Sequence, residues 1–574
     1  MDNFRLILIA ALIFILLMLY QAWQDDYGPK PPSNVASTPT TEMLGTPEQS
    51  QSSSSSSESE VPIANDSQIS SAEVPVPTMQ ATRLLSSESR IQVETDVLRL
   101  EIDTKGGDVR RVDLLDYPVE VDTPDNPLRL MNDEFPNLFI AQSGLMPKGY
   151  NPNKVEHQNL LVPTHQKAVY QSEQPAYRLG SGAERLEVKL HWQDGKGLKV
   201  IKVYTFQRGS HVIDIKHIVE NDTDQPWQGR LYGQFQRTQA DLGGSRFLYT
   251  YMGGAIGSPE QLYEKVSFDD IQDGSFNQEN RPDWAGGWAA MLQHYFVAAL
   301  IPEREQIYHY YTNTLKGSRY VLGLYGPMQT VAARNQHVFK ITLYAGPKLQ
   351  NKLAALAAGL DLTVDYGWLW FIAQPLFWTL EFIHKLVGNW GLAIIIITML
   401  IKLAFFHLSA TSYKSMANMR RLQPRMVTLK ERYGDDKARL NQAMMDLYKK
   451  EKINPLGGCL PIVVQIPVFI ALYWVLLESV ELRQASFMLW INDLSSPDPY
   501  FVLPLIMGAT MLVQHHLNPA PIDPMQQKVM MVLPLVFTVF FAFFPAGLVL
   551  YWVVNNALSI AQQWVITKKI AGNV

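Results

Sequence analysis

Residues 390–409 read WGLAIIIITMLIKLAFFHLS, and this stretch decides the class of fold. Its 20 residues contain one formally charged side chain, that of Lys402. A helix needs about 20 consecutive apolar residues to cross the roughly 30 Å hydrocarbon core of a bilayer. The stretch therefore predicts a transmembrane helix that carries one cation.

Further apolar runs lie on both sides of this helix. Near the N-terminus, residues 1–23 hold an unbroken apolar run from Leu6 to Tyr20, and no small-x-small cleavage pattern follows it, so we expect an uncleaved anchor. The other runs are residues 456–477, 500–517, 529–544 and 547–567. Pro545 and Gly547 separate the last two, which indicates a tight hairpin rather than one long helix. The sequence predicts an α-helical membrane bundle with six spans.

The distribution of Lys and Arg orients this bundle. Residues 410–452 carry 11 basic and 5 acidic side chains, and Lys568 and Lys569 follow the last apolar run. The loop between the third and fourth predicted spans is acidic instead. Because cytoplasmic loops are enriched in Lys and Arg, we expect residues 410–452 and both termini in the cytoplasm and residues 24–389 outside.

The overall composition excludes several classes of protein. The 574 residues include 49 Lys plus Arg and 54 Asp plus Glu, a formal net charge of -5, which argues against general nucleic-acid binding. Hydrophobic residues make up 47% and charged residues 18%. The single cysteine, Cys459, excludes an intramolecular disulfide and a cysteine-based metal centre. This composition indicates a membrane protein with a large water-soluble part.

Two segments of different character precede the helical region. Residues 24–89 are predicted to be a disordered linker, because the part from 24 to 80 holds 13 Ser, 8 Pro and one aromatic residue. Residues 90–345 change to short runs with period-two alternation, of the kind found in half-buried strands. The clearest runs are residues 97–102, 185–190, 199–204 and 337–344. About 250 residues of this kind predict a large external antiparallel β-sandwich.

Two helical segments are expected to lie outside the hydrocarbon core. Residues 366–388 are rich in Trp and Phe and place Gln374, Glu381 and Lys385 on one stripe, a pattern typical of an interfacial amphipathic helix. In residues 410–452, Met and Leu recur at three- and four-residue steps, which predicts a cytoplasmic helical hairpin. Its basic outer face suits RNA-rich or anionic-lipid partners, and equally a plain solvated surface.

Lys402 is the one formally charged residue inside the five C-terminal spans. A cation inside a membrane is costly and indicates a functional site, unless its stem reaches the interface. Thr398 lies one turn earlier on the same helix face. Other spans contain the polar residues Gln465, Thr510, Gln514, Asn555 and Asn556. These side chains either form a wet, positively charged recess open to the cytoplasm and the inner leaflet, or make ordinary interhelical hydrogen bonds.

Motifs of enzymes and of ion-coupled transporters are missing from the sequence. No Asp or Glu lies in the interior of the five spans, and proton-coupled transport and intramembrane aspartyl proteolysis both need such carboxylates. H-E-x-x-H, G-x-S-x-G and G-x-x-x-x-G-K-[ST] do not occur. We therefore predict no enzyme, no cofactor and no metal. A lone cation suits a transient acidic ligand, such as the translocated tail of a nascent membrane protein.

Seven short motifs resemble those of one family. They are IIIIT at 394–398, QP at 423–424, GDDK at 434–437, NPLGGC at 454–459, SVELRQA at 479–485, DPMQQK at 523–528 and FPAGLVLYW at 544–552. Together, over residues 361–567, they are similar to the YidC/Oxa/Alb membrane-protein insertases. The N-terminal anchor and large external domain resemble the Gram-negative YidC branch, whose periplasmic domain is a β-supersandwich.

The resemblance implies an insertase and chaperone of the bacterial inner membrane that inserts and helps fold nascent membrane proteins, alone or with the Sec translocon. It also implies that the ribosome is contacted through the cytoplasmic hairpin. The cation of the family's substrate groove is usually Arg, and Lys402 takes its place here. Thr398, Gln465, Tyr551 and Trp552 match the groove-lining positions. A channel or transporter and an envelope scaffold are the alternative functions.

Overall fold

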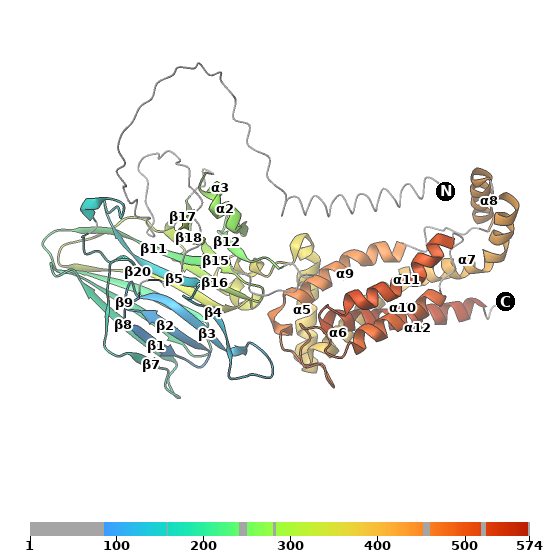
Figure 1. Ribbon diagram of the computed structural model, residues 1–574, viewed down its shortest axis with the longest axis horizontal. Helices are drawn as coiled ribbons and strands as arrows, with labels where there is room; N and C mark the ends of the chain where they lie inside the picture. Colours follow the sequence, from blue (N-terminus) through green and yellow to red (C-terminus); the bar gives the residue numbers. More distant parts are fainter. Residues whose placement is uncertain are drawn as a thin grey trace, which may run out of the picture.

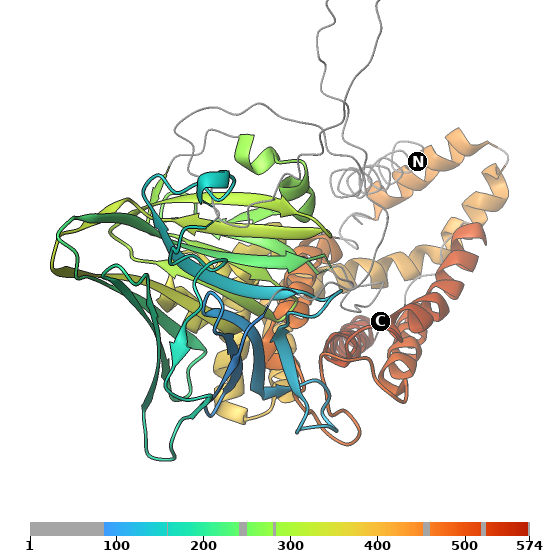
Figure 2. The same ribbon diagram turned by 60° about the vertical axis from the view of Figure 1, so that its left-hand side comes forward.

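The computed structural model describes residues 85, 87–157, 159–239, 250–278, 283–434, 436–451, 460–517 and 524–571. The predicted anchor at 1–23 lies outside the described residues, and so does the predicted linker at 24–89 apart from residues 85 and 87–89. The described chain forms a β-sandwich that is joined to one end of a set of helices (Figure 1, Figure 2).

The sandwich consists of a sheet of 11 strands and a sheet of 9 strands. Across the larger sheet the strands are β14 (Trp284–Ala285), β17 (Ile307–Leu315), β18 (Arg319–Tyr325), β11 (Trp227–Thr238), β5 (Phe139–Pro147), β3 (Asp108–Pro118), β2 (Leu98–Asp103), β1 (Arg90–Glu94) and β7 (Ala176–Arg178), with β19 (Gln329–Val331) beside β11 and β4 (Pro127–Met131) beside β3. Across the smaller sheet they are β13 (Glu264–Val266), β12 (Gly253–Gly257), β15 (Trp288–Leu292), β16 (Phe296–Pro302), β20 (Asn335–Pro347), β10 (Val212–Asn221), β9 (Leu198–Gln207), β8 (Arg185–Gln193) and β6 (Gln171–Ser172).

The period-two runs of the sequence lie in strands. The four clearest runs fall in β2, β8, β9 and β20. In β10, burial changes at every residue, because one face of the strand packs into the core between the sheets. β16 is buried along its whole length instead. Its outer face is covered by α4 (Gln350–Leu356), whose Leu353 belongs to a second apolar cluster with Trp288 and Ala299.

The sandwich is not wholly antiparallel, which corrects the prediction. β1 and β7 pair in parallel at the edge of the larger sheet, with Val93 opposite Tyr177. The chain reaches β7 directly after β6, which belongs to the smaller sheet. A parallel pair needs a long connection of this kind, because a tight turn reverses the chain.

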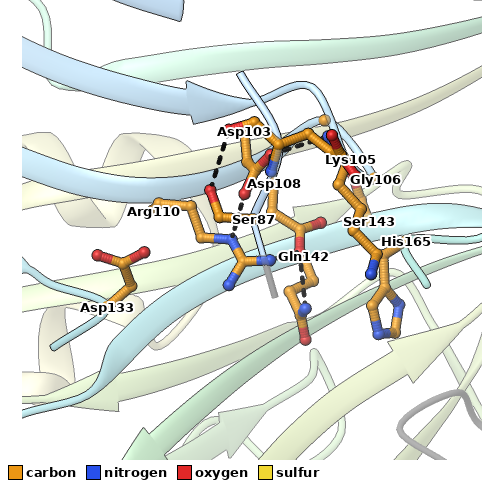
Figure 3. Close-up of polar contacts among 12 residues, drawn as sticks. Ser87, Asp103, Lys105, Gly106, Asp108, Arg110, Asp133, Gln142, Ser143 and His165 are labelled. Carbon is orange, nitrogen blue, oxygen red and sulfur yellow. Dashed lines mark hydrogen bonds and ion pairs between the residues drawn. The ribbon is translucent and has the colours of Figure 1, made fainter. Parts of the chain in front are cut away.

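A polar cluster is buried within the larger sheet (Figure 3). Arg110 of β3 lies 3.3 Å from Asp108 and 3.8 Å from Asp103. Gln142 of the neighbouring strand β5 donates to Asp108 at 2.7 Å. All four side chains are almost fully buried, and buried charges are tolerated only when they are paired or hydrogen-bonded in this way.

Lys202 of β9 joins this cluster from the smaller sheet. Its Nζ donates to the carbonyl oxygens of Gly106, Gly107 and Ser143 at 3.0, 2.9 and 3.0 Å. Three donated bonds use all three hydrogens of an ammonium group. The fully buried lysine therefore ties one sheet to the turn and strand of the other.

Eight longer helices follow the sandwich. They are α5 (Trp370–Val387), α6 (Trp390–Ala404), α7 (Phe406–Tyr433), α8 (Lys437–Lys450), α9 (Leu460–Glu478), α10 (Val502–Leu517), α11 (Pro524–Phe541) and α12 (Ala546–Ala571). The short elements among the described residues are η1 (Val155–His157), α2 (Phe268–Gln272), α3 (Ser275–Gln278), η2 (Leu360–Thr363), η3 (Gly367–Leu369) and η5 (Val480–Leu482). In Figure 1, α5 runs across the direction of α9, α10 and α12, and α8 lies at the far end from the sandwich.

The helix predicted at 390–409 is divided. α6 ends at Ala404, and α7 begins at Phe406 after a bend of 68°. The first arm of the hairpin is therefore longer than predicted and starts before residue 410. Neither Pro nor Gly occurs at this bend, so the sequence carries no signal of the kind that usually marks a sharp kink.

Among the described helices, none is by itself both long and apolar enough to cross a membrane, whereas the bent pair α6 and α7 meets that requirement together. Three shorter apolar helices cover Val463–Glu478, Val502–Leu517 and Gln527–Phe541. The six spans therefore stay a prediction.

The sandwich meets the helices at the end of α9. Arg483 and Gln484 both donate to the carbonyl oxygen of Pro118 in β3, at 2.7 and 2.9 Å. His294, between β15 and β16, lies 3.0 Å from the carbonyl oxygen of Leu477. Burial lowers the pKa of His294 to about 4, so the imidazole is neutral near pH 7 and its Nε2–H donates this bond. These contacts fasten the sandwich to the end of the bundle.

Candidate functional site

Lys402 lies near the C-terminal end of α6 and contacts α12. Its Nζ donates a hydrogen bond of 2.8 Å to the hydroxyl oxygen of Ser559. Thr398, one turn earlier on α6, is only 1% exposed, and its hydroxyl donates to the carbonyl oxygen of Ile394 at 2.6 Å. α6 thus directs its cation toward α12, while the threonine hydroxyl is bonded within its own helix.

Lys402 borders a cavity of about 270 Å³, which we call the polar recess. Its lining residues are Lys402, Ser409, Ser412, Tyr413, Met416, Gln465, Ile466, Phe469, Gln514, Tyr551, Trp552, Asn555, Asn556 and Ser559. They come from α6, α7, α9, α10 and α12. Most are polar, and the space is large enough for several water molecules.

α12 supplies the largest share of the lining. Tyr551, Asn555 and Ser559 follow one another at four-residue steps, so they lie on one face of the helix. The side chain of Gln465 in α9 donates to Asn555 at 2.9 Å. The hydroxyl of Ser559 donates to the carbonyl oxygen of Asn555 at 2.7 Å, which leaves its oxygen free to accept from Lys402.

Aromatic side chains form the inner end of the recess. Phe469 of α9 stacks on Tyr551 with ring centroids 5.8 Å apart and meets Trp552 edge-on at 4.8 Å. Phe541 of α11 lies 4.8 Å from Trp552 on another side. α12 runs away from the sandwich, and Tyr551 and Trp552 precede Ser559 along this helix (Figure 1).

The chemistry of the lining favours binding over catalysis. Among the described residues that line the recess, none is an Asp, Glu, His or Cys, the side chains that most often serve as general acids and bases or as metal ligands. Likewise, no group of acidic, His or Cys side chains that could hold a metal is found among the residues that the structure describes. An ammonium group among hydroxyls and amides can instead hold water, hydrogen-bond peptide groups and attract carboxylates.

The structure brings four of the five predicted groove residues together. The recess is lined by Lys402, Gln465, Tyr551 and Trp552. Thr398 is not among its lining residues. Ser559, the hydrogen-bond partner of Lys402, was not predicted as a groove residue. Its four-residue spacing from Asn555 indicates that the two side chains lie on the same face of α12.

Comparison with known proteins gives two adjoining family matches. The family model described as YidC periplasmic domain matches residues 90–379, and the one described as 60Kd inner membrane protein matches residues 382–573. These matches define the chain as an inner-membrane protein with a periplasmic domain.

Full-length relatives identify the family. The chain is 49% identical over 571 residues to the membrane protein insertase YidC of Nitrosococcus oceani, covering 99% of both chains. It is 50% identical over 577 residues to that of Thioalkalivibrio sulfidiphilus, again covering 99% of both. A crystal structure of an active YidC insertase aligns with 16% identity and a TM-score of 0.36, over 84% of this chain and 93% of that one. On the sequence matches, the chain belongs to the YidC family of membrane protein insertases, which is not a family of enzymes.

Proposed function

We propose that this insertase passes hydrophilic segments of nascent membrane proteins through the polar recess, with Lys402 as its central cation. The observation that carries the proposal is a lysine among polar side chains in a cavity whose described lining residues include no Asp or Glu. A cation in a protected site is usually balanced by a resident carboxylate. Here a passing substrate can supply that negative charge. We propose that Lys402 contacts the substrate together with Gln465, Tyr551 and Trp552. Thr398 is proposed to stabilise α6 through its hydrogen bond within that helix.

Such a recess shortens the distance over which a polar segment of the substrate has to cross hydrocarbon. An unsatisfied peptide group costs several kcal/mol in hydrocarbon, so a polar tail crosses a bilayer slowly without help. In the recess, water and the side chains of α9 and α12 replace part of the hydrocarbon. An acidic side chain 4 Å from the ammonium group gains about 4 kcal/mol at an effective dielectric constant near 20. Burial of the apolar part of the substrate in lipid, at about 25 cal/mol per Å², supplies the driving force without a nucleotide.

The proposed topology has six spans, with the anchor at 1–23 as the first. α6, α9, α10, α11 and α12 belong to the others, both termini and the hairpin of α7 and α8 are cytoplasmic, and residues 24–389 are periplasmic. The basic composition of residues 410–452 supports this orientation. The sandwich and α8 lie at opposite ends of the helices, as the orientation requires (Figure 1).

α5 is proposed to lie in the periplasmic interface of the membrane. Its inner face is buried against the bundle through Ala373, Phe377 and Leu380. Large apolar side chains project on its other sides, namely Trp370, Phe371, Trp378, Phe382 and Leu386, all more than half exposed. Trp is enriched at membrane–water interfaces, and α5 runs across the other helices as an interfacial helix would (Figure 1).

The hairpin of α7 and α8 is proposed to contact the ribosome. Its arms pack through Met426, Leu440 and Met444, while Arg420 and Arg425 are exposed. An exposed basic surface attracts the phosphates of ribosomal RNA through a sequence-independent, salt-dependent interaction. The motif resemblance further leads us to propose that the chain acts alone or with the Sec translocon.

Charge reversal at Lys402 tests the proposed function. Full-length Lys402→Glu protein in liposomes should insert a single-span substrate with an acidic tail at least about tenfold less well, because attraction becomes repulsion of similar size. Lys402→Arg should retain insertion, since the charge remains. Lys414→Glu makes the same charge change on an exposed part of α7 outside the recess and serves as the matched control. Normal insertion of the acidic-tailed substrate by Lys402→Glu would overturn the proposal.

A further inference from the structure

The loop of residues 483–501, which leads from η5 to α10, carries an apolar tip. Its segment 485–492 reads ASFMLWIN and has no charged residue. Leu489 is 81% exposed and Met488 is 49% exposed, whereas Ile491 is only 4% exposed. The loop therefore has its own buried apolar contacts and still presents two large apolar side chains outward.

The tip is held in one conformation by backbone hydrogen bonds. The N–H of Phe487 donates to the carbonyl oxygen of Ile491 at 2.9 Å, and the N–H of Ile491 donates to that of Met488 at 3.1 Å. Leu489 lies at the apex with a φ of 56°, in the left-handed region that Gly and Asn adopt more readily than Leu. The loop thus holds a large apolar side chain at its apex in a conformation that carries a backbone cost, which points to a function for this side chain.

Two aspartates brace the loop and direct their charges inward. Asp493 accepts from the N–H and the hydroxyl of Ser495 at 2.8 and 2.7 Å. Asp498, which is 1% exposed, accepts from the indole N–H of Trp490 at 2.9 Å and from the N–H of Leu503 at 2.7 Å. Both carboxylates are thus bonded to groups of the loop and of the first turn of α10, and the tip itself stays apolar.

The tip lies where the apolar outer faces of the helices begin. Asn389, just before α6, donates to the carbonyl oxygen of Phe487 at 2.9 Å, and the Phe487 ring packs directly on Gly391. Leu386, at the end of α5, is 71% exposed, and Leu505, in the first turn of α10, is 62% exposed. Both helices adjoin the loop, α5 through Asn389 and α10 as the helix that follows the loop in the chain.

We propose that Met488 and Leu489 insert into the acyl region of the periplasmic leaflet and anchor this end of the bundle in the lipid. The inference rests on the proposed topology, in which the same leaflet surrounds α5 and the start of α10. The lipid bilayer is the partner because the tip is uncharged and continuous with helix faces that, in an inner-membrane protein, have acyl chains as their surroundings. Arg483, at the base of the loop, binds the sandwich, so the anchored tip also fixes the height of the sandwich above the membrane.

Site-specific fluorescence tests this proposal in the full-length chain. In a Cys459→Ser background, single cysteines Leu489→Cys, Leu505→Cys and Val155→Cys are labelled with an environment-sensitive nitrobenzoxadiazole dye. The proteins are placed in vesicles of phosphatidylethanolamine and phosphatidylglycerol, with or without acyl-chain spin-labelled lipid. Val155 is 79% exposed on the sandwich and reports water, whereas Leu505 reports the environment of α10.

The dye at position 489 should show blue-shifted emission and lose most of its fluorescence to the spin-labelled lipid, as the dye at 505 should, while the dye at 155 does neither. Water-like emission at 489 together with a lipid signal at 505 would overturn the inference and leave the topology standing. Water-like emission at both positions would overturn both. A tip that binds another protein instead of lipid would give the first of these two negative results, because the vesicles contain only the purified chain.

Discussion

The Nζ of Lys402 lies 2.8 Å from the hydroxyl oxygen of Ser559, and that hydroxyl donates its own hydrogen to the carbonyl oxygen of Asn555. The backbone of α12 therefore orients the serine so that a lone pair faces the ammonium group. The lysine stem is flexible, but its charged end has a defined place over α12. Ser559 is thus a positioning residue for the cation of the recess.

Removal of this hydroxyl should weaken the selectivity of the recess for acidic substrates. Hydrogen bonds to charged groups contribute about 1.5–3 kcal/mol, and water in the recess replaces part of this contribution in Ser559→Ala. We therefore expect insertion of an acidic-tailed substrate to fall about three- to tenfold. The assay is insertion of paired substrates with acidic and neutral tails. Insertion of the neutral-tailed substrate should be unaffected. Ser559→Thr, which keeps the hydroxyl, should restore insertion of the acidic-tailed substrate. Equal losses for both substrates would show that Ser559 only stabilises the fold.

Replacement of Lys202 should destabilise the sandwich. In Lys202→Met, the carbonyl oxygens of Gly106 and Ser143 lose the lysine donor at a cost of about 1–3 kcal/mol each, whereas that of Gly107 still accepts from the hydroxyl of Tyr204. The loss is partly offset because no charge is buried any longer, so we expect a net loss of about 2–4 kcal/mol. Thermal unfolding of the full chain in detergent, followed by circular dichroism, measures the change. Lys199→Met on the same strand is the control, since Lys199 makes an exposed ion pair with Asp222. An unchanged unfolding midpoint in Lys202→Met would contradict the role assigned to this lysine.

His211 should make the sandwich sensitive to acid. The residue is 4% exposed between Tyr117 and Tyr344, and neither of its ring nitrogens has a hydrogen-bond partner among the described residues. Burial lowers its pKa from 6.5 to about 4. Between these values the unfolded chain binds a proton that the folded chain does not, so stability falls as the pH drops from 6.5 to 4, by about 3 kcal/mol in all.

The variant His211→Phe keeps the ring and removes this titration. Its free energy of unfolding relative to the unmodified chain should therefore rise as the pH falls through this window and stay constant above pH 7. Denaturant titrations of both chains at a series of pH values measure the difference. A difference that does not vary with pH would rule out His211 as the source.

A methyl group at Gly391 should disturb the contact between α6 and the loop of residues 483–501. An added Cβ would lie 2.0 Å from Cδ2 of the Phe487 ring, too close for any real contact. Gly-to-Ala exchange normally favours a helix by about 1 kcal/mol, but overpacking of this kind costs about 1–3 kcal/mol, so Gly391→Ala should lower the thermal midpoint. Gly182→Ala, where the new methyl group meets nothing within 4 Å, is the matched control. A midpoint equal to that of the control would show that Phe487 moves aside freely.

The strands of the sandwich could be predicted from local pattern, whereas their pairing could not. Alternation in residues 185–190 reflects burial of one face of β8, and the polarity of each residue there indicates which face it occupies. The parallel pairing of β1 and β7 depends on the path of a long connection, and no local residue reveals that path. The bend between α6 and α7 was missed for a similar reason, because it lacks Pro and Gly.

The candidate groove could likewise be predicted in part from local pattern, and the rest depends on tertiary packing. Helical periodicity alone places Tyr551, Asn555 and Ser559 on one face of α12. Which helix faces which is a matter of tertiary packing. This packing brings Gln465 to Asn555, whereas the hydroxyl of Thr398 donates to the carbonyl oxygen of Ile394 in its own helix. A single charged residue in five apolar segments was enough to locate the recess, since the cost of such a charge restricts where it can lie.

The first turn of α12 is bonded to the same loop that carries Leu489. The N–H groups of Ala546 and Gly547 donate to the carbonyl oxygens of Ser496 and Leu494 at 2.8 and 2.9 Å. The base of that loop also binds the sandwich. A movement of this end of α12 therefore requires that these hydrogen bonds break or that the sandwich moves with the helix. The wall of the recess that carries Asn555 and Ser559 is therefore attached at one end to this loop and, through it, to the sandwich. α9 is bonded to the sandwich as well, through the carbonyl oxygen of Leu477, so we expect that α7 is the lining helix that moves if a substrate widens the recess.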